Sequence, residues 1–166
     1  MKMQIVGYQE KYAEKLSEIV VRNLMEVNSR DYPIREIRRL ILGFGPEQIR
    51  NFAQKREIFV AAEGDEPIGI LTIEPSWNGP KGEYYFLTIF VQPEYHRKGV
   101  GRALIAAGEA YVRANDGVKI TIPSSITSHA FYHKMGYAYT SEQPDREGHY
   151  IMEKYLGPGS EEEAAR

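Results

Sequence analysis

Cysteine is absent from this chain of 166 residues, which excludes disulfides, thiolate metal sites and a cysteine nucleophile. The chain also lacks an apolar run of about 20 residues, the length that a membrane-spanning helix needs. Its first ten residues, MKMQIVGYQE, contain no apolar segment of the kind that a signal peptide requires. Charge of one sign is not in excess either, because the formal net charge is −2. We therefore expect a cytoplasmic monomer or homodimer with no nucleic-acid or membrane partner.

The apolar residues that are present follow strand and helix patterns. Strand-like runs cover residues 3–7, 57–63, 67–75, 83–91, 118–122, 137–141 and 149–155. Helical spacing covers residues 10–28, a segment from Pro33 to the stop at Gly43 and Gly45, and residues 46–56, 99–116 and 128–135. In the helix over residues 99–116 we expect one buried face, with Glu109 away from it and Gly117 as the stop. That face consists of Val100, Leu104, Ala107, Tyr111 and Ala114.

This order of elements predicts one α/β domain over residues 1–156. The order is β-α-α-β-β-β-α-β-α-β-β, which gives a mixed, mostly antiparallel central sheet flanked by helices. Residues 83–91, EYYFLTIFV, are apolar on both faces and should form a central strand. Residues 157–166, GPGSEEEAAR, have too little apolar surface to fold and predict a flexible acidic tail.

The segment VQPEYHRKGVGRAL, residues 91–104, joins this central strand to the long helix. Gly99 and Gly101 lie at the turn, where glycine lets backbone N–H groups approach an anion and the helix start supplies unpaired donors. Three cations, Arg97, Lys98 and Arg102, lie close by. These features indicate a pyrophosphate site, although an ordinary glycine turn with solvated cations also explains them.

Two sharper phosphate motifs do not fit this segment. A dinucleotide fingerprint needs a third glycine or alanine, and Leu104 occupies that position. A Walker loop needs GKS or GKT after four spacers, which is absent here.

The same segment resembles the acyl-CoA signature of the GNAT superfamily. In that signature a strand ends in Val-x-Pro, and [Gln/Arg]-x-x-Gly-x-[Gly/Ala] opens a helix. Val91, Pro93, Gly99 and Gly101 match the pattern, and His96 stands in place of glutamine or arginine.

Residues 124–137, SSITSHAFYHKMGY, resemble a second GNAT motif. That motif is an asparagine near the start of a helix, followed by Tyr-x-x-x-Gly-[Phe/Tyr]. Tyr132, Gly136 and Tyr137 match it, and Ser125 stands where the asparagine usually does. The order of elements matches the family over residues 3–156, so the resemblance implies a GNAT-type sheet.

The resemblance also implies that acetyl-CoA is the co-substrate. Its pantetheine arm would lie along Ile89, Phe90 and Val91 and bond to their backbone as an added strand would. A backbone N–H near Phe90 or Val91 would receive the acetyl carbonyl. The other cofactor-binding residues implied by the motifs are His96, Arg97, Lys98, Gly99, Val100, Gly101, Arg102, Ser125 and Tyr132.

Tyr132 has the family's position for the acid that protonates the leaving thiolate. Its spacing also fits a core stripe with Phe131 and Met135.

Glu83 is a candidate base for the amine, directly or through water, because GNAT bases often lie on that strand. An exposed strand-end glutamate is the alternative interpretation, and Glu74 is a weaker candidate. Neither histidines nor carboxylates have metal-ligand spacing, so we expect no metal.

The implied activity is an acetyl-CoA-dependent N-acetyltransferase that acts on a primary amine by direct attack in a ternary complex. Two alternatives remain: an acyl-CoA-binding sensor without turnover, and an interaction domain with a coincidental glycine turn. In this family, residues corresponding to 23–32 and 141–149 normally select the substrate. Acids in these segments suit a cationic amine, but they also suit an ordinary solvated surface; they include Glu26, Asp31, Glu142, Asp145 and Glu147.

Overall fold

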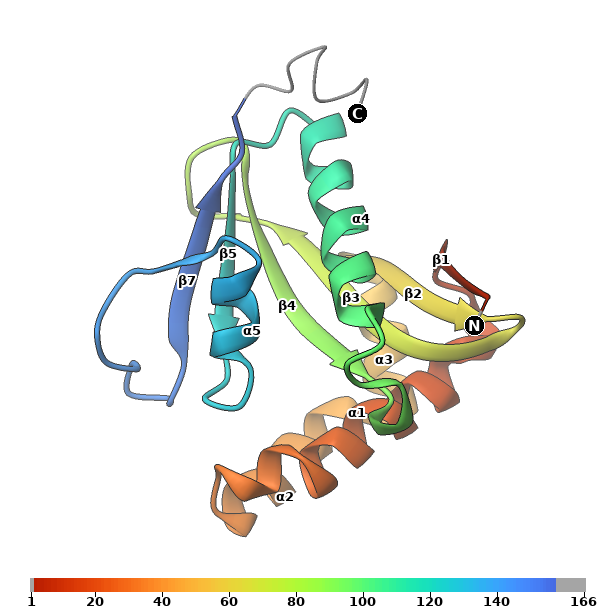
Figure 1. The fold of residues 1–166 in the computed structure, drawn as a ribbon. Helices are drawn as coiled ribbons and strands as arrows, with labels where there is room; N and C mark the ends of the chain where they lie inside the picture. Colours follow the sequence, from red (N-terminus) through yellow and green to blue (C-terminus); the bar gives the residue numbers. More distant parts are fainter. Residues whose placement is uncertain (1, 158–166) are drawn as a thin grey trace. The chain divides into compact units, whose positions relative to one another are not determined.

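A computed structural model describes residues 2–157 of the chain (Figure 1). Within them the chain forms two compact units, one of residues 2–73 and 88–107 and the other of residues 74–87 and 108–157. The strands form a sheet in the order β1-β2-β3-β4-β5-β7-β6. The β4–β5 pair is parallel, whereas β1–β2, β2–β3, β5–β7 and β6–β7 are antiparallel. The expected mixed, mostly antiparallel α/β sheet is therefore confirmed.

The first unit contains three helices and the first strands. They are β1 (Met3–Gly7), α1 (Ala13–Glu26), α2 (Ile34–Ile41), α3 (Pro46–Lys55), β2 (Glu57–Glu63) and β3 (Glu66–Pro75), which ends in the second unit. α1 packs against both α2 and α3. Apolar residues of α1 recur at helical spacing and are fully buried with residues of α3, β2 and β3; this core includes Leu16, Ile19, Val20, Ile49, Val60 and Ile70.

Besides β3, two elements run through both units: β4 (Glu83–Val91) and α4 (Val100–Ala114). The other elements of the second unit are β5 (Lys119–Ser124), α5 (His129–Lys134), β6 (Ala138–Tyr139) and β7 (Tyr150–Tyr155). β5 pairs with β7 over its whole length, and α5 lies against β7 (Figure 1). None of the described helices combines the length and apolar character that a membrane crossing requires.

The boundaries of β1, β2 and β4 agree with the sequence-based prediction. β5 begins one residue later and ends two residues later than expected, and β6 has two residues instead of five. The expected acidic tail lies outside the described residues except for Gly157.

The end of α4 differs in detail from the expected glycine stop. Asp116 takes the left-handed backbone conformation, with φ 59°. The N–H of Gly117 then bonds to the Val112 carbonyl oxygen at 2.8 Å, which closes the last turn. A Cβ on Gly117 would lie 2.2 Å from Val112 Cγ1, so glycine is needed there for space.

The prediction that Glu109 lies away from the buried part of α4 was wrong, because this residue is only 8% exposed. Ile105 and Val112 are also fully buried. Of the predicted face, Val100 and Leu104 are buried, but Ala107 and Tyr111 are only half-buried and Ala114 is exposed. The buried face of α4 is therefore turned towards Ile105, Glu109 and Val112.

Candidate active site

The end of β4 leads into a tight turn within the first unit. The Gln92 N–H donates to the Ile68 carbonyl oxygen at 2.8 Å, which holds the chain one residue beyond the strand. Pro93 then begins a short 3₁₀ helix, in which the His96 N–H donates to the Pro93 carbonyl oxygen at 3.1 Å. Proline suits this position because its fixed φ fits a first helical turn.

Residues 96–101, here called the phosphate loop, connect this turn to α4. Arg97 and Gly99 both have left-handed backbone angles, with φ 60° and 83°. A Cβ on Gly99 would meet no atom within 4 Å, so glycine is needed for its φ and leaves open space above the backbone. Turns of this kind converge N–H groups into anion-binding concavities, and the start of α4 adds its dipole.

The charged side chains of the phosphate loop face solvent. Arg97 and Lys98 are exposed, as is Arg102 in the first turn of α4. Lys98 Nζ lies 5.4 Å from the centre of the Tyr95 ring. The open backbone and the three exposed cations fit a multiply charged anion such as a pyrophosphate.

A second set of contacts fixes the last residue of β4. Asn23 on α1 is 4% exposed, and its Nδ2 donates to the Val91 carbonyl oxygen at 2.8 Å and to the Ile19 carbonyl oxygen at 2.9 Å. His96 Nε2 lies 2.7 Å from the same Val91 oxygen and must carry a proton, because a carbonyl can only accept. Two side-chain donors therefore bond to the Val91 carbonyl oxygen and hold the end of β4.

α1 also forms an ion pair with the short 3₁₀ helix that precedes the phosphate loop. The Arg22 guanidinium donates to both carboxylate oxygens of Glu94, at 2.7 and 3.0 Å, and to Glu26 at 3.1 Å. The hydrogen bonds from Arg22 lower the pKa of Glu94 to about 2. The same bonds, together with the bond to Glu26, raise the pKa of the Arg22 guanidinium. The sequence-based prediction missed Arg22, Asn23 and Glu94, whose partners are 68 or more residues away along the chain.

The residues expected along the pantetheine arm, Ile89, Phe90 and Val91, are half-buried on β4. Just before them, the Thr88 N–H donates to the Thr72 hydroxyl at 3.1 Å. The Phe90 ring packs edge-on against Phe44 at 6.2 Å. Contacts with Thr72 and Phe44 therefore hold this part of β4 in place.

Tyr132 lies on α5 in the second unit and is 5% exposed. Its ring contacts Phe131 at 5.3 Å and Tyr137 at 6.4 Å, measured between centres. Burial raises the pKa of the Tyr132 hydroxyl, so this group keeps its proton at neutral pH. A buried core contact and a proton donor are both consistent with this position.

Ser125 lies in the turn before α5. Its hydroxyl donates to the Ser128 hydroxyl at 3.2 Å, and its carbonyl accepts the Ser128 N–H at 3.2 Å. Ser125 therefore helps to form the turn that leads into the helix of Tyr132.

A buried ionic cluster holds the C-terminal end of α5. Glu109 Oε1 accepts hydrogen bonds from the Tyr137 hydroxyl and from Lys154 Nζ, both at 3.0 Å. Lys154 Nζ also donates to the carbonyl of Met135, directly after α5, at 3.1 Å. Burial and the Glu109 charge raise the pKa of Tyr137. No local pattern indicated this cluster, because its members come from α4, the end of α5 and β7.

Glu83, the predicted base, lies at the start of β4. Its carboxylate is 3.5 Å from Lys119 Nζ, which also contacts Glu153 at 3.1 Å. Six residues separate Glu83 from Ile89, a span of about 20 Å along an extended strand. The structure thus groups the phosphate-loop residues with Val91 in the first unit, and it places Glu83, Ser125 and Tyr132 in the second.

Comparisons with known proteins agree with the fold. The profile of the acetyltransferase (GNAT) family matches residues 21–137. YafP, an uncharacterized N-acetyltransferase of Escherichia coli K12, is 25% identical over 152 residues, which cover 85% of each chain.

Solved structures share the fold over nearly the whole chain. PaiA N-acetyltransferase of Thermoplasma acidophilum, solved with coenzyme A, has a TM-score of 0.81 at 19% identity over 94% of this chain and 100% of its own. An aminoglycoside 6'-N-acetyltransferase complexed with coenzyme A has a TM-score of 0.73 at 14% identity over 95% and 99%. Because the profile match covers more than half of the residues, the chain belongs to the GNAT family of N-acetyltransferases, which use acetyl-CoA as the acyl donor.

Proposed function

We propose that this chain transfers the acetyl group of acetyl-CoA to a primary amine by direct attack in a ternary complex. The phosphate loop carries the proposal. Gly99 keeps the backbone open at φ 83°, α4 begins directly after it, and Arg97 and Lys98 are exposed beside it. These groups would bind the pyrophosphate of CoA through backbone N–H groups and charge.

In the reaction the amine nitrogen forms a bond to the acetyl carbonyl carbon, and the carbon–sulfur bond breaks. The leaving sulfur gains a proton, and the nitrogen loses one. We assign the proton donor to the Tyr132 hydroxyl. Because burial raises the pKa of Tyr132, its anion is costly. Tyr132 would therefore give its proton to sulfur only as it receives one from the attacking nitrogen.

The proposal gives Glu83 no proton-transfer step. Its carboxylate is already paired with Lys119, and Glu83 lies far along β4 from the strand segment expected to hold the thioester. A free amine in equilibrium with its ammonium form can enter the reaction without a dedicated carboxylate.

Two measurements test the proposed function. Calorimetric titration with acetyl-CoA should show binding, and thiol release should follow when a panel of primary amines is added. Binding without release for every amine would instead support an acyl-CoA sensor. Absence of binding would refute both interpretations of the phosphate loop.

A further inference from the structure

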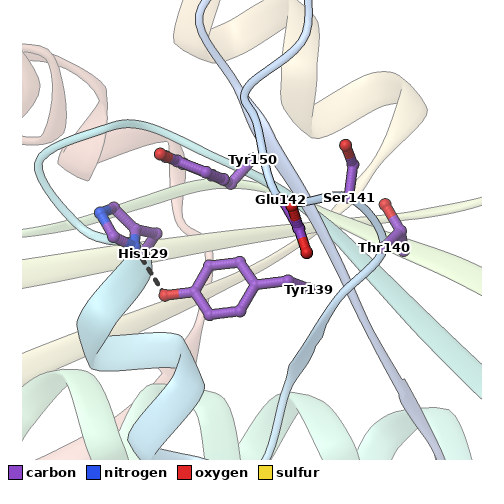
Figure 2. A pocket seen from close by; sticks show the side chains of 6 residues that line it. All are labelled: His129, Tyr139, Thr140, Ser141, Glu142 and Tyr150. Carbon is purple, nitrogen blue, oxygen red and sulfur yellow. Dashed lines mark hydrogen bonds between the residues drawn. The ribbon is translucent and has the colours of Figure 1, made fainter.

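A pocket of about 480 Å³ lies in the second unit beside the start of α5 (Figure 2). α5 contributes one side of it, and the chain from β6 to β7 contributes the rest. Its volume suits a small molecule. The lining residues are His129, Tyr139, Thr140, Ser141, Glu142 and Tyr150.

Three aromatic rings contact one another in the wall of this pocket. His129 and Tyr150 lie 4.4 Å apart between ring centres, and Tyr139 lies 5.6 Å from each of them. His129 Nδ1 and the Tyr139 hydroxyl are joined by a hydrogen bond of 2.6 Å, the dashed line in Figure 2. This bond fixes the Tyr139 ring, and the face of a tyrosine ring attracts cations.

The charge of the lining also favours a cation. Glu142 contributes a carboxylate, and none of the six lining residues is a lysine or an arginine. Thr140 and Ser141 add hydroxyl groups that can accept hydrogen bonds from an ammonium group.

The loop that presents these groups is ordered by a second carboxylate. Asp145 Oδ1 accepts the N–H groups of Glu147 and His149, each at 2.9 Å. These backbone donors lower the pKa of Asp145, which therefore stays charged near neutrality. Asp145 is thus committed to the turn, and Glu142 is the carboxylate that lines the pocket.

We propose that this pocket binds a second ammonium group of the acceptor, so that the substrate is a diamine or polyamine. This inference rests on the proposed acetyl transfer. His129 and Tyr132 are three residues apart on α5, a spacing that places their Cβ atoms about 5–6 Å apart. The pocket therefore adjoins the helical turn that carries the proposed acid, and a bifunctional amine suits this arrangement.

The test compares substrates that differ only in the distal group. Diaminobutane, diaminopentane and diaminohexane are each matched with the amino alcohol of the same chain length, and thiol release is measured. We expect a KM for the best diamine about tenfold below that of its amino alcohol. Glu142→Gln and Tyr139→Leu should remove this preference by raising the KM of the diamine more than that of the amino alcohol. Glu66→Gln, which removes an exposed carboxylate at the start of β3, is the control and should keep the preference.

Two results would overturn the inference while acetyl transfer stands. The wild-type enzyme could treat the diamine and the amino alcohol alike, or the preference could survive in Glu142→Gln. If no amine is acetylated, the proposed function fails, and calorimetric titration with diaminobutane judges the pocket alone. Binding to the wild type that is lost in Glu142→Gln then supports a diamine site, and absence of binding refutes it.

Discussion

The buried side chain of Asn23 donates a hydrogen bond of 2.8 Å to the carbonyl oxygen of Val91, the last residue of β4. This bond ties α1 to the point where the chain enters the phosphate loop. His96 bonds the same oxygen from the loop itself. A helix that is distant in sequence therefore supports the backbone that we propose holds acetyl-CoA.

Replacement of Asn23 should weaken both folding and cofactor binding. Asn23→Leu keeps the approximate volume and removes both donated bonds, so we expect a loss of about 1 kcal/mol in the free energy of unfolding. The Kd for acetyl-CoA should rise about fivefold, because the end of β4 loses one of its two supports. Denaturant unfolding and calorimetry measure the two effects.

Asn115→Leu is the matched control for this change. Asn115 also donates from Nδ2 to a carbonyl four residues earlier, at 2.8 Å, but it is exposed near the end of α4. It should leave acetyl-CoA affinity unchanged. Equal affinity in Asn23→Leu and the wild type would show that α1 does not support the site.

Gly99→Ala should lower acetyl-CoA affinity. Alanine at φ 83° is strained by about 1–2 kcal/mol although its Cβ meets no neighbour. Relief of that strain would turn the backbone N–H groups away from the phosphates, so we expect the Kd to rise about tenfold or more. Calorimetry measures this.

Gly64→Ala is the control that distinguishes a loss of stability from a loss of acetyl-CoA affinity. Gly64 has φ 61° in the turn between β2 and β3, and its Cβ would also meet nothing within 4 Å. It should lower stability by a similar amount and leave the Kd unchanged. A similar loss of affinity in both variants would attribute the Gly99 effect to general destabilisation.

Salt should weaken acetyl-CoA binding through the exposed cations Arg97, Lys98 and Arg102. Dissolved ions screen the attraction between these side chains and the phosphates, so the Kd should rise with ionic strength. Lys98→Ala should make this rise shallower, whereas Lys55→Ala, at an exposed position near the end of α3, should not. A Kd that is independent of salt in the wild type would show that these cations only contact solvent.

Local patterns predicted much of the fold and part of the candidate site. β4 was recognised because its nine-residue run is dominated by aromatic and β-branched residues, a local pattern that can be identified without knowledge of distant partners. The phosphate loop was recognised because its glycines and cations are adjacent in sequence. Asn23 entered the prediction as the first residue of the segment 23–32 that should select the substrate, and its bond to Val91, 68 residues away, was not predicted.

Glu109 shows why the rest could not be predicted. Helical spacing assigned it to the side of α4 away from the apolar face, and a glutamate buried alone would be costly. Its burial depends on Tyr137 and Lys154, which contribute two hydrogen bonds from elements formed later in the chain. A one-dimensional pattern contains no information about such partners.

The Arg22–Glu94 pair gives a prediction for pH. The pKa of Glu94 falls from 4.5 to about 2 in the folded chain because Arg22 donates to its carboxylate. A depressed folded-state pKa stabilises the fold above the ordinary value, and this contribution disappears as the pH falls from 4.5 towards about 2. NMR titration should find the low pKa in the wild type and a clearly higher pKa in Arg22→Gln, because the Arg22 hydrogen bonds are the largest cause of the shift. The same low value in both would assign the shift to the backbone alone.

Tyr132→Phe tests the proposed acid, because it keeps the buried ring and removes only the hydroxyl. If that hydroxyl protonates the leaving sulfur, kcat should fall by about 10²-fold, while the Kd for acetyl-CoA changes little. Stopped-flow or steady-state thiol release measures the rate, and calorimetry measures the Kd. A wild-type rate in this variant would mean that water or another group donates the proton.

Tyr137→Phe is the control that distinguishes chemistry from packing. Its hydroxyl is also buried, but it donates to Glu109 at 3.0 Å and is therefore committed to the ionic cluster at the end of α5. Removing it should lower the free energy of unfolding by about 1–3 kcal/mol, because Glu109 loses a donor. The effect on kcat should be much smaller than for Tyr132→Phe. If instead both variants lose stability and neither loses rate, the two tyrosines are core residues alike, and the acid must lie elsewhere.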